Sequence, residues 1–237
     1  MSDRRLSLSR VLRALRGRYG EPRPPVSTDP FQLILWEQVA YLAPDERRQE
    51  AFEALRTRVG LAPAGIAAAP AATLAAVARI GGAIAAGSRA GRMRRSAQMV
   101  LARWHGDLRG ALALPTEKAR RALAAFPMIG EPGADKILVF AGTAPLVPLE
   151  SNGLRVLQRL GMAPASADYR RDYRAAREAL AAQAPRTRRA RSAAYFLLRE
   201  HGQRTCRRSV PQCTLCPLQR GCPTGRAVRR GEAPSLA

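Results

Sequence analysis

Four cysteines are the residues whose type and spacing most directly indicate chemistry. They are the only cysteines in the 237-residue chain and follow the spacing C-x6-C-x2-C-x5-C, as Cys206, Cys213, Cys216 and Cys222. Soft thiolates at this density select zinc or an iron–sulfur cluster over hard cations. Zinc sites commonly contain two C-x2-C pairs, whereas this chain has one pair flanked by two single cysteines. The spacing therefore favours a [4Fe–4S] cluster, with zinc and unliganded thiols as alternatives. A disulfide would need an oxidising compartment, and no signal peptide is recognisable.

The composition places these cysteines in a strongly basic chain. Forty Lys and Arg residues outnumber eighteen Asp and Glu residues, giving a net charge of +22, and only Lys118 and Lys136 are lysines. Such a field attracts polyanions, of which nucleic acid is the commonest. Codon bias is an alternative explanation for arginine in place of lysine, although it does not explain the shortage of acids. A membrane surface is a second alternative partner.

The hydrophobic pattern predicts an all-α protein. Leu8, Val11, Leu12 and Leu15 fall at helical spacing, so the arginine-rich N-terminus is interpreted as an amphipathic helix rather than a targeting presequence. No apolar run reaches the roughly twenty residues of a membrane span. No convincing strand pattern is found. Further helices are predicted at 31–42, 45–59, 73–80, 92–104, 116–126, 134–141, 152–160, 169–183 and 187–201.

A turn rich in Gly and Pro links two of these helices. Its sequence is Phe126-Pro127-Met128-Ile129-Gly130-Glu131-Pro132-Gly133-Ala134. Such a turn can direct several backbone N–H groups at one phosphate, assisted by the N-terminal dipole of the following helix. A plain helix–helix connection is the alternative.

Together these motifs carry a resemblance to a known family. The turn resembles the helix-hairpin-helix element of the endonuclease III superfamily of DNA glycosylases, which typically carry L-P-G-[VI]-G there. The same superfamily has a C-x6-C-x2-C-x5-C loop that ligates a [4Fe–4S] cluster, and the segment from Leu198 to Cys206 looks like the helix and H-G-x-x-x-C motif that precede it. The similarity extends from about Asp29 to Cys222. It implies that DNA is contacted by Pro127, Met128, Ile129, Gly130, Gly133, Lys136 and Arg155. By position, His201 is expected to order the loop rather than bind metal.

The resemblance implies a two-domain helical fold. Residues 30–146 would form a six-helix barrel containing the helix-hairpin-helix, and 147–226 the iron–sulfur domain. Residues 1–29 would contribute a helix packed on the cluster domain, and 227–237 a disordered tail.

One catalytic residue of the family is missing. Bifunctional members use a lysine two residues after the second hairpin glycine, where this chain has Pro132. Neither Lys118 nor Lys136 aligns with that position. The resemblance therefore implies base excision without efficient lyase activity.

Three other residues are candidates for catalysis. Glu150, in Leu149-Glu150-Ser151-Asn152, takes the place of a family aspartate that stabilises positive charge on the sugar, although it is alternatively a helix cap. Glu37 resembles a glutamate that protonates the departing base in the family's adenine glycosylases, and burial would suit it to act as an acid. Its alternative is a structural ion pair with an arginine. Tyr41 could stack on an extruded base or belong to the core.

The sequence thus predicts a monofunctional DNA glycosylase of base-excision repair. It would flip a damaged or mismatched base of double-stranded DNA into a cleft between two helical domains. Two alternatives are a catalytically silent DNA-binding protein on the same scaffold and a protein whose basic surface binds RNA. We expect a bacterial cytoplasmic monomer that associates with the nucleoid through DNA and has no membrane partner.

Overall fold

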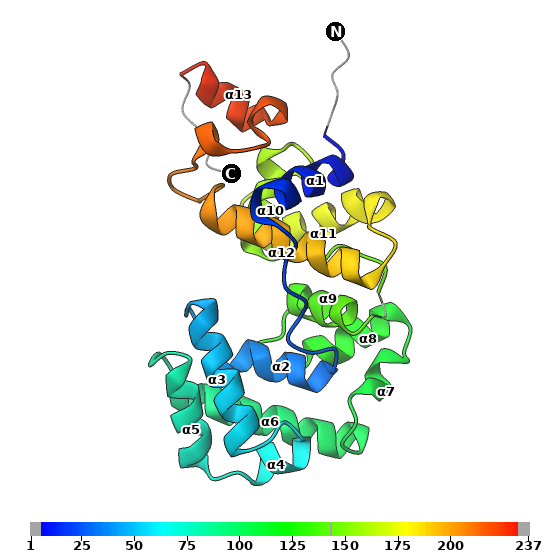
Figure 1. Cartoon of the computed structure of the whole chain (residues 1–237). Coiled ribbons are helices and arrows are strands. Elements are labelled where there is room, and N and C mark those ends of the chain that lie inside the picture. Colours follow the sequence, from blue (N-terminus) through cyan, green and yellow to red (C-terminus); the bar gives the residue numbers. More distant parts are fainter. Residues whose placement is uncertain (1–5, 143, 232–237) are drawn as a thin grey trace. The chain divides into compact units, whose positions relative to one another are not determined.

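The computed structural model describes residues 6–142 and 144–231, and every regular element in these residues is helical (Figure 1). The predicted all-α class is therefore confirmed. No helix in the described part of the chain is long and apolar enough to cross a membrane. The chain divides into two compact units. One runs from Val26 through Gly142, and the other is formed by the residues before Val26 and those from Ala144 onward.

The first unit contains eight of the described helices. They are α2 (Pro30–Val39), α3 (Asp45–Arg58), α4 (Pro63–Ala68), α5 (Ala71–Ile80), α6 (Ala86–Trp104), α7 (Arg109–Leu112), α8 (Thr116–Ala124) and α9 (Glu131–Phe140). Asp29 begins α2 as its N-cap, since its carboxylate accepts the Gln32 N–H at 3.0 Å, with Pro30 in the first turn. Helix α2 packs against α3, α6 and α9. This central position explains why α2 is apolar almost all round.

Several boundaries in this unit differ from the sequence-based prediction. Helix α6 begins at Ala86 instead of Arg92, and α9 begins at Glu131 instead of Ala134. Pro132 is compatible with the earlier start of α9, because a proline in the first turn removes no intrahelical hydrogen bond. Helices α4 and α7 were not predicted. Both are short and lie in segments rich in Ala and Gly, where the hydrophobic period is weak.

The second unit is built around α10 (Ser151–Arg159) and α12 (Arg188–Arg204). Its other elements are α1 (Leu8–Tyr19), α11 (Tyr169–Leu180), α13 (Pro223–Arg229) and three 3-10 helices, η1 (Ala181–Gln183), η2 (Cys213–Leu215) and η3 (Gln219–Gly221). The predicted stripe of α1 is buried in one core with residues of α10, α11, α12 and the cysteine loop: Leu8, Val11, Leu12, Leu15, Leu157, Tyr173, Leu197 and Cys222. The N-terminal helix is thus an integral part of the unit that carries the cysteines (Figure 1).

The C-terminus requires one correction. A disordered tail was predicted from Ala227, but α13 is helical as far as Arg229. The helix begins with Pro223 in its first turn, directly after the last cysteine, which favours helix initiation there. Residues 232–237 of the predicted tail, and residues 1–5 of the predicted N-terminal segment, lie outside the described residues.

Candidate metal centre and nucleic-acid interface

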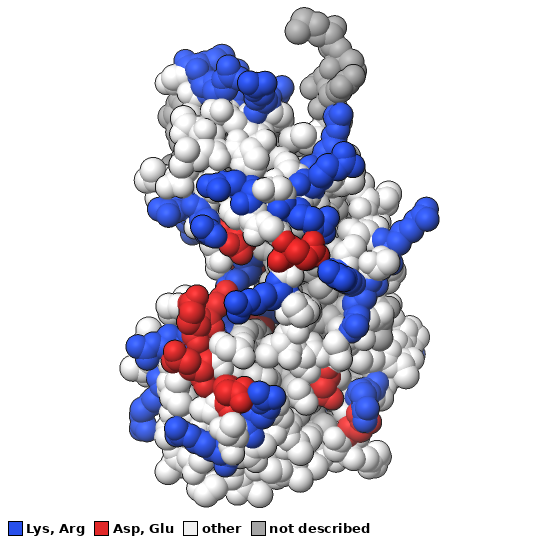
Figure 2. Space-filling view, viewed as in Figure 1, with Lys and Arg blue, Asp and Glu red and all other residues white. Residues whose placement is uncertain are grey.

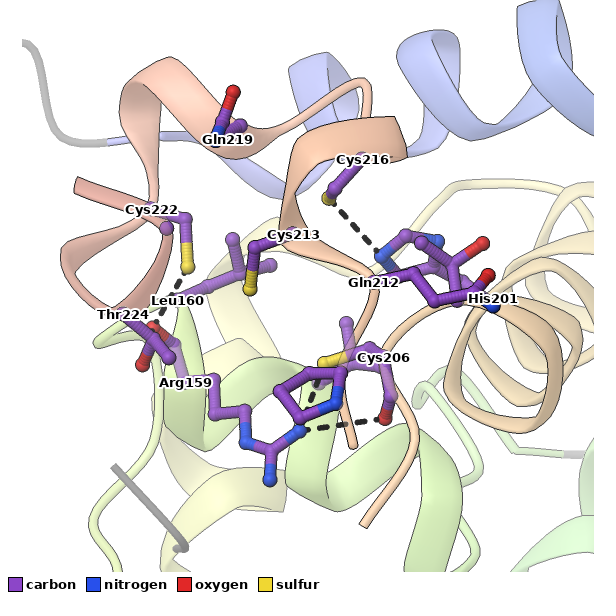
Figure 3. Close-up of a pocket in the computed structure, with 14 residues that line it drawn as sticks. Arg159, Leu160, His201, Cys206, Gln212, Cys213, Cys216, Gln219, Cys222 and Thr224 are labelled. Carbon is purple, nitrogen blue, oxygen red and sulfur yellow. Dashed lines mark hydrogen bonds between the residues drawn. The ribbon is translucent and has the colours of Figure 1, made fainter. Parts of the chain in front are cut away.

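The four cysteines line a single cavity in the second unit. Cys206 follows α12, Cys213 is the first residue of η2, Cys216 directly follows η2, and Cys222 precedes α13. The cavity encloses about 360 Å³, including space open to solvent, and all four side chains are directed into it (Figure 3). Within the described residues, no set of three or more His, Cys, Asp or Glu side chains is arranged to hold a metal ion. The four thiols nevertheless line the same cavity.

The chemistry of this donor set suits a cation. Burial, together with the nearby Cys206, Cys213 and Cys222 sulfurs, raises the pKa of the Cys216 thiol to about 12. Burial likewise raises the pKa values of Cys213 and Cys222. Crowded, buried sulfurs of this kind are held as thiolates only when positive charge lies among them, which is what a metal or iron–sulfur group provides. The residues present therefore fit such a group.

Two side chains outside the cysteine set reach the sulfurs. Arg159, only 3% exposed, donates to Cys206 Sγ at 3.5 Å and to the Arg207 carbonyl oxygen at 2.7 Å. The Nε2 atom of His201 lies 3.5 Å from Cys216 Sγ (Figure 3). Neither was predicted to touch a cysteine, because contacts between α10, α12 and the loop carry no signal in the sequence.

His201 is fixed by a second set of contacts. Its Nδ1 atom lies 2.9 Å from the hydroxyl of Tyr19, the last residue of α1, and that hydroxyl lies 2.7 Å from Thr205 Oγ1. Burial lowers the pKa of His201 to about 4, so its imidazole is neutral at physiological pH. The position supports the expectation that His201 orders the loop.

Glu150 lies at the start of α10 and is held by two hydrogen bonds. Its Oε1 accepts the Gly153 N–H at 2.8 Å and its Oε2 accepts Asn152 Nδ2 at 2.8 Å. The alternative interpretation as a helix cap is thus realised in the structure. Capping does not consume the carboxylate, since each oxygen still has a second lone pair. The side chain is partly exposed, so a group approaching the helix N-terminus can reach it.

Arg155 does not occupy the position expected of a DNA contact. The residue is 6% exposed, and its guanidinium donates to Asn152 Oδ1 and the Gly202 carbonyl oxygen, both at 2.8 Å, and to the Cys206 carbonyl oxygen at 3.1 Å. This arrangement connects Glu150, through Asn152, to the backbone of the first cysteine. We do not propose Arg155 as a DNA contact.

The hairpin in the first unit has an unusual backbone at its tip. Met128 has a φ of 66° and an exposed side chain, with Arg92 donating to its sulfur at 2.8 Å. Ile129 is buried and its N–H donates to the Phe126 carbonyl oxygen, so it serves the turn itself. Gly130 is exposed and precedes α9. The first N–H groups of α9 have no acceptor within the helix and are the groups available to a phosphate.

The hairpin is anchored to α2 by Gln38. This fully buried side chain donates from Nε2 to the Pro127 carbonyl oxygen at 2.7 Å and to Ser96 Oγ at 2.8 Å. The neighbouring Glu37 forms an ion pair with Lys136 of α9, with Oε1 and Nζ 2.7 Å apart. The structure therefore brings two predicted site residues together. It supplies Glu37 with a lysine partner where the sequence suggested an arginine.

The loop between α2 and α3 and the loop between α5 and α6 expose apolar side chains that the sequence analysis did not select. Leu42 is 78% exposed and Ile84 is 58% exposed, and the predicted site residue Tyr41 is 44% exposed. The loops lie side by side, because a Cβ atom on Gly81 would fall 2.4 Å from the Val39 carbonyl oxygen and 2.9 Å from the Ala40 Cβ. Tyr41 is thus on the surface rather than in the core. No signal in the sequence marked this exposure, because the predicted helix 31–42 included Tyr41 and Leu42, whereas α2 ends at Val39.

The charges are unevenly distributed. Figure 2 shows Lys and Arg side chains over the visible face of the unit that carries α12 and α13, whereas acidic side chains gather over α3 in the other unit. The acidic residues of α3 are Asp45, Glu46, Glu50 and Glu53. The same helix also carries four arginines, Arg47, Arg48, Arg56 and Arg58.

Solved structures share this fold. A trapped covalent endonuclease III–DNA intermediate has a TM-score of 0.73 at 20% identity, covering 95% of this chain and 100% of the other. A thermostable thymine-DNA glycosylase has a TM-score of 0.71 at 15% identity, and the match covers 92% of this chain and 94% of the glycosylase chain. The H. pylori 3-methyladenine DNA glycosylase bound to 1,N6-ethenoadenine has a TM-score of 0.65 at 17% identity. This match covers 84% of this chain and 98% of the H. pylori chain. No protein-family model and no curated protein matches the sequence.

These likenesses confirm the expected resemblance at the level of the fold. The chain has the endonuclease III fold along almost its whole length. At such low identities the fold does not carry an activity with it, so function rests on the site residues.

Proposed function

We propose that this chain is a DNA glycosylase of base-excision repair. It would hydrolyse the N-glycosidic bond of a damaged or mismatched base in double-stranded DNA. The observation that carries the proposal is the carboxylate of Glu150, which two hydrogen bonds hold at the N-terminus of α10 in a chain with the endonuclease III fold. The proposal includes a monomer and the absence of efficient lyase activity.

Glu150 is suited to stabilise an electron-poor sugar. As the base departs, positive charge develops on the deoxyribose ring, and a fixed carboxylate stabilises it without having to reorganise. The Asn152 and Gly153 donors fix the side-chain rotamer. The same carboxylate can orient the water that attacks C1′.

The Glu37–Lys136 pair is the proposed source of the proton for the departing base. The two side chains are 23% and 14% exposed, so the pair is shielded while remaining accessible from one side. In this proposal a proton moves from Lys136 Nζ to the Glu37 carboxylate and from Glu37 to a base nitrogen within hydrogen-bond distance, which leaves Lys136 neutral until solvent reprotonates it. Pro132 leaves the hairpin without a nucleophile, which accounts for the proposed lack of lyase activity.

DNA binding is assigned to the hairpin and the two exposed loops. The first N–H groups of α9 would contact one phosphate, and Gly130 and Gly133 allow close approach of the backbone. Leu42 and Ile84 are suited to enter the base stack beside an extruded nucleotide, as apolar side chains do in other proteins that kink DNA. Tyr41 can stack on an unpaired base.

The cysteine cavity is the proposed site of a [4Fe–4S] cluster. Cys206, Cys213, Cys216 and Cys222 would hold it, and it would keep the C-terminal loop rigid. Purification without air should give a brown protein with iron and acid-labile sulfide in equal amounts. Stoichiometric zinc and no sulfide would instead establish the zinc alternative.

The activity is tested with duplex oligonucleotides that each carry one lesion or mismatch. Incubation followed by hot alkali cleaves at any abasic site, and the expected result is cleavage of at least one duplex after alkali but not before it. A silent DNA-binding protein would bind the same duplexes and give no alkali-sensitive sites. Comparable binding to structured RNA in competition at physiological salt would favour the RNA alternative.

A further inference from the structure

One hydrogen-bond network connects the N-terminal helix to a single cysteine. Tyr19 of α1 contacts Thr205 and His201, and His201 contacts Cys216, at 2.7, 2.9 and 3.5 Å respectively. Thr205 and His201 are 5% and 1% exposed, so the network is shielded from water. Tyr19 is thus connected through His201 to the sulfur of Cys216, which lies almost two hundred residues further along the chain.

When Cys216 is a thiolate, the donor and the acceptor of each hydrogen bond in the network can be assigned. A thiolate only accepts, so the His201 Nε2 atom must carry the proton that lies between them. A neutral imidazole has one N–H, and its Nδ1 atom must then accept the Tyr19 O–H. The Tyr19 oxygen in turn accepts the Thr205 O–H. Every donor is used once.

We infer that His201, oriented by Tyr19, is a positioning residue that donates from Nε2 to Cys216 and raises the reduction potential of the cluster bound there. This inference rests on the proposed [4Fe–4S] cluster. Reduction adds negative charge to the cluster and its sulfurs, and a hydrogen-bond donor to sulfur stabilises that charge. The potential should therefore fall when the donor is lost.

Among the hydrogen-bond donors to Cys216, His201 is the one that a side-chain substitution can readily remove. The Leu218 backbone N–H also donates to Cys216 Sγ, at 3.4 Å, but among substitutions only proline would remove this backbone donor. Arg159 is directed at a different sulfur, that of Cys206. The ring of Tyr19 packs near that of His201, with centroids 5.9 Å apart, which restricts rotation of the imidazole. Loss of the Tyr19 hydroxyl should therefore weaken the donor without removing the packing.

The experiment measures the reduction potential of the cluster in the purified holoprotein by anaerobic redox titration. The variants are His201→Leu, which removes the donor, His201→Gln, whose amide nitrogen can replace Nε2, and Tyr19→Phe. His105→Gln is the matched control, because His105 is the only other histidine and is exposed in the other unit. We expect the potential to become more negative in His201→Leu, to move in the same direction by less in Tyr19→Phe, and to return toward wild type in His201→Gln.

The possible outcomes distinguish failure of the His201 inference from failure of the cluster proposal. If the variants keep their iron and sulfide and the potentials equal that of His105→Gln, this inference is overturned while the cluster stands. If wild-type protein contains neither iron nor sulfide, the cluster proposal and this inference fail together. Should His201→Leu fail to fold, Tyr19→Phe alone decides, since it removes one oxygen atom from a partly exposed side chain. An unchanged potential in Tyr19→Phe then overturns the inference.

Discussion

Asn152 donates a hydrogen bond from Nδ2 to Glu150 Oε2 at 2.8 Å, and its own Oδ1 accepts one from Arg155 at 2.8 Å. Arg155 also donates to the Cys206 carbonyl oxygen. A polar chain therefore runs from the proposed catalytic carboxylate to the backbone of the cysteine loop within one structural unit. The orientation of Glu150 consequently depends on Asn152 and, through it, on the buried Arg155.

Replacing Glu150 by Gln should separate catalysis from binding. The amide oxygen of Gln can still accept the Gly153 N–H, so the helix cap is retained, while the negative charge and the hydrogen bond accepted from Asn152 Nδ2 are lost. Base excision should fall by a factor of about 100 or more, as for other charge-stabilising groups in active sites. Single-turnover excision and DNA affinity would be measured on the same duplex. Unchanged excision would remove Glu150 from the mechanism.

Glu150→Asp is the matched variant for chain length. It keeps the charge and shortens the side chain, so it should retain far more activity than Glu150→Gln. Equal loss in both would indicate that position rather than charge is critical.

The lack of an aligned lysine predicts the absence of a covalent intermediate. Borohydride reduction of the protein with abasic DNA should trap no adduct, because Pro132 cannot form a Schiff base. Pro132→Lys should produce a trapped adduct, visible as a band of reduced mobility on a denaturing gel. Lys136→Gln is the control: a wild-type adduct that disappears in this variant would assign the nucleophile to Lys136 and contradict the prediction.

The helices that bury a regular stripe were predictable, and the contacts between them were not. The α1 stripe at Leu8, Val11, Leu12 and Leu15 is buried as its spacing requires. The cysteine spacing likewise predicted four sulfurs around one point. The partner of Glu37 and the burial of Arg155 depend on which helices approach each other, and a local pattern contains no such information. Leu42 and Ile84 were missed because an exposed apolar side chain is distinguishable only once the core is known.

Met128 is predicted to make the hairpin less stable than glycine would. Its φ of 66° lies in the left-handed region, which costs a residue with a Cβ atom about 1 kcal/mol relative to glycine. Met128→Gly should raise the free energy of unfolding by up to about 1 kcal/mol, measured by urea denaturation. Met128→Ala is the control, because it removes the same contact with Arg92 but keeps the strain. Equal effects of the two substitutions would contradict this explanation.

Asp172 predicts a pH dependence of stability. Burial raises its pKa, but hydrogen bonds from the Ser166 N–H and hydroxyl, both at 2.7 Å, and from Gln158 at 2.9 Å outweigh this, and the pKa is lowered. Because the folded pKa lies below the unfolded value of about 3.9, the carboxylate stabilises the fold above that pH and loses this contribution as the pH falls through the folded pKa.

The test compares Asp172→Asn with wild type by chemical denaturation. The variant should be less stable by about 1–3 kcal/mol at pH 7, and the difference should narrow below about pH 4. Comparing the two proteins at each pH cancels effects of acid on the rest of the chain. A difference that stays constant from pH 7 to pH 3 would contradict the assignment.

Gly202 sets the distance between α10 and α12 and hence the position of Asn152. A Cβ atom at Gly202 would lie 2.6 Å from the Asn152 carbonyl oxygen and 2.7 Å from its Cβ atom, so Gly202→Ala must push the helices apart. Overpacking of this kind costs about 1–3 kcal/mol. The shift also moves Asn152 away from Glu150, so excision should fall more than DNA affinity.

The matched control is Gly17→Ala in α1. Nothing lies within 4 Å of a Cβ atom there, so alanine should stabilise the helix by about 0.5 kcal/mol and leave excision unchanged. Unfolding in urea and single-turnover excision would be measured for both variants. If Gly202→Ala lost stability but kept full excision, the approach of the two helices would matter for folding alone, and the coupling of Asn152 to catalysis would be wrong.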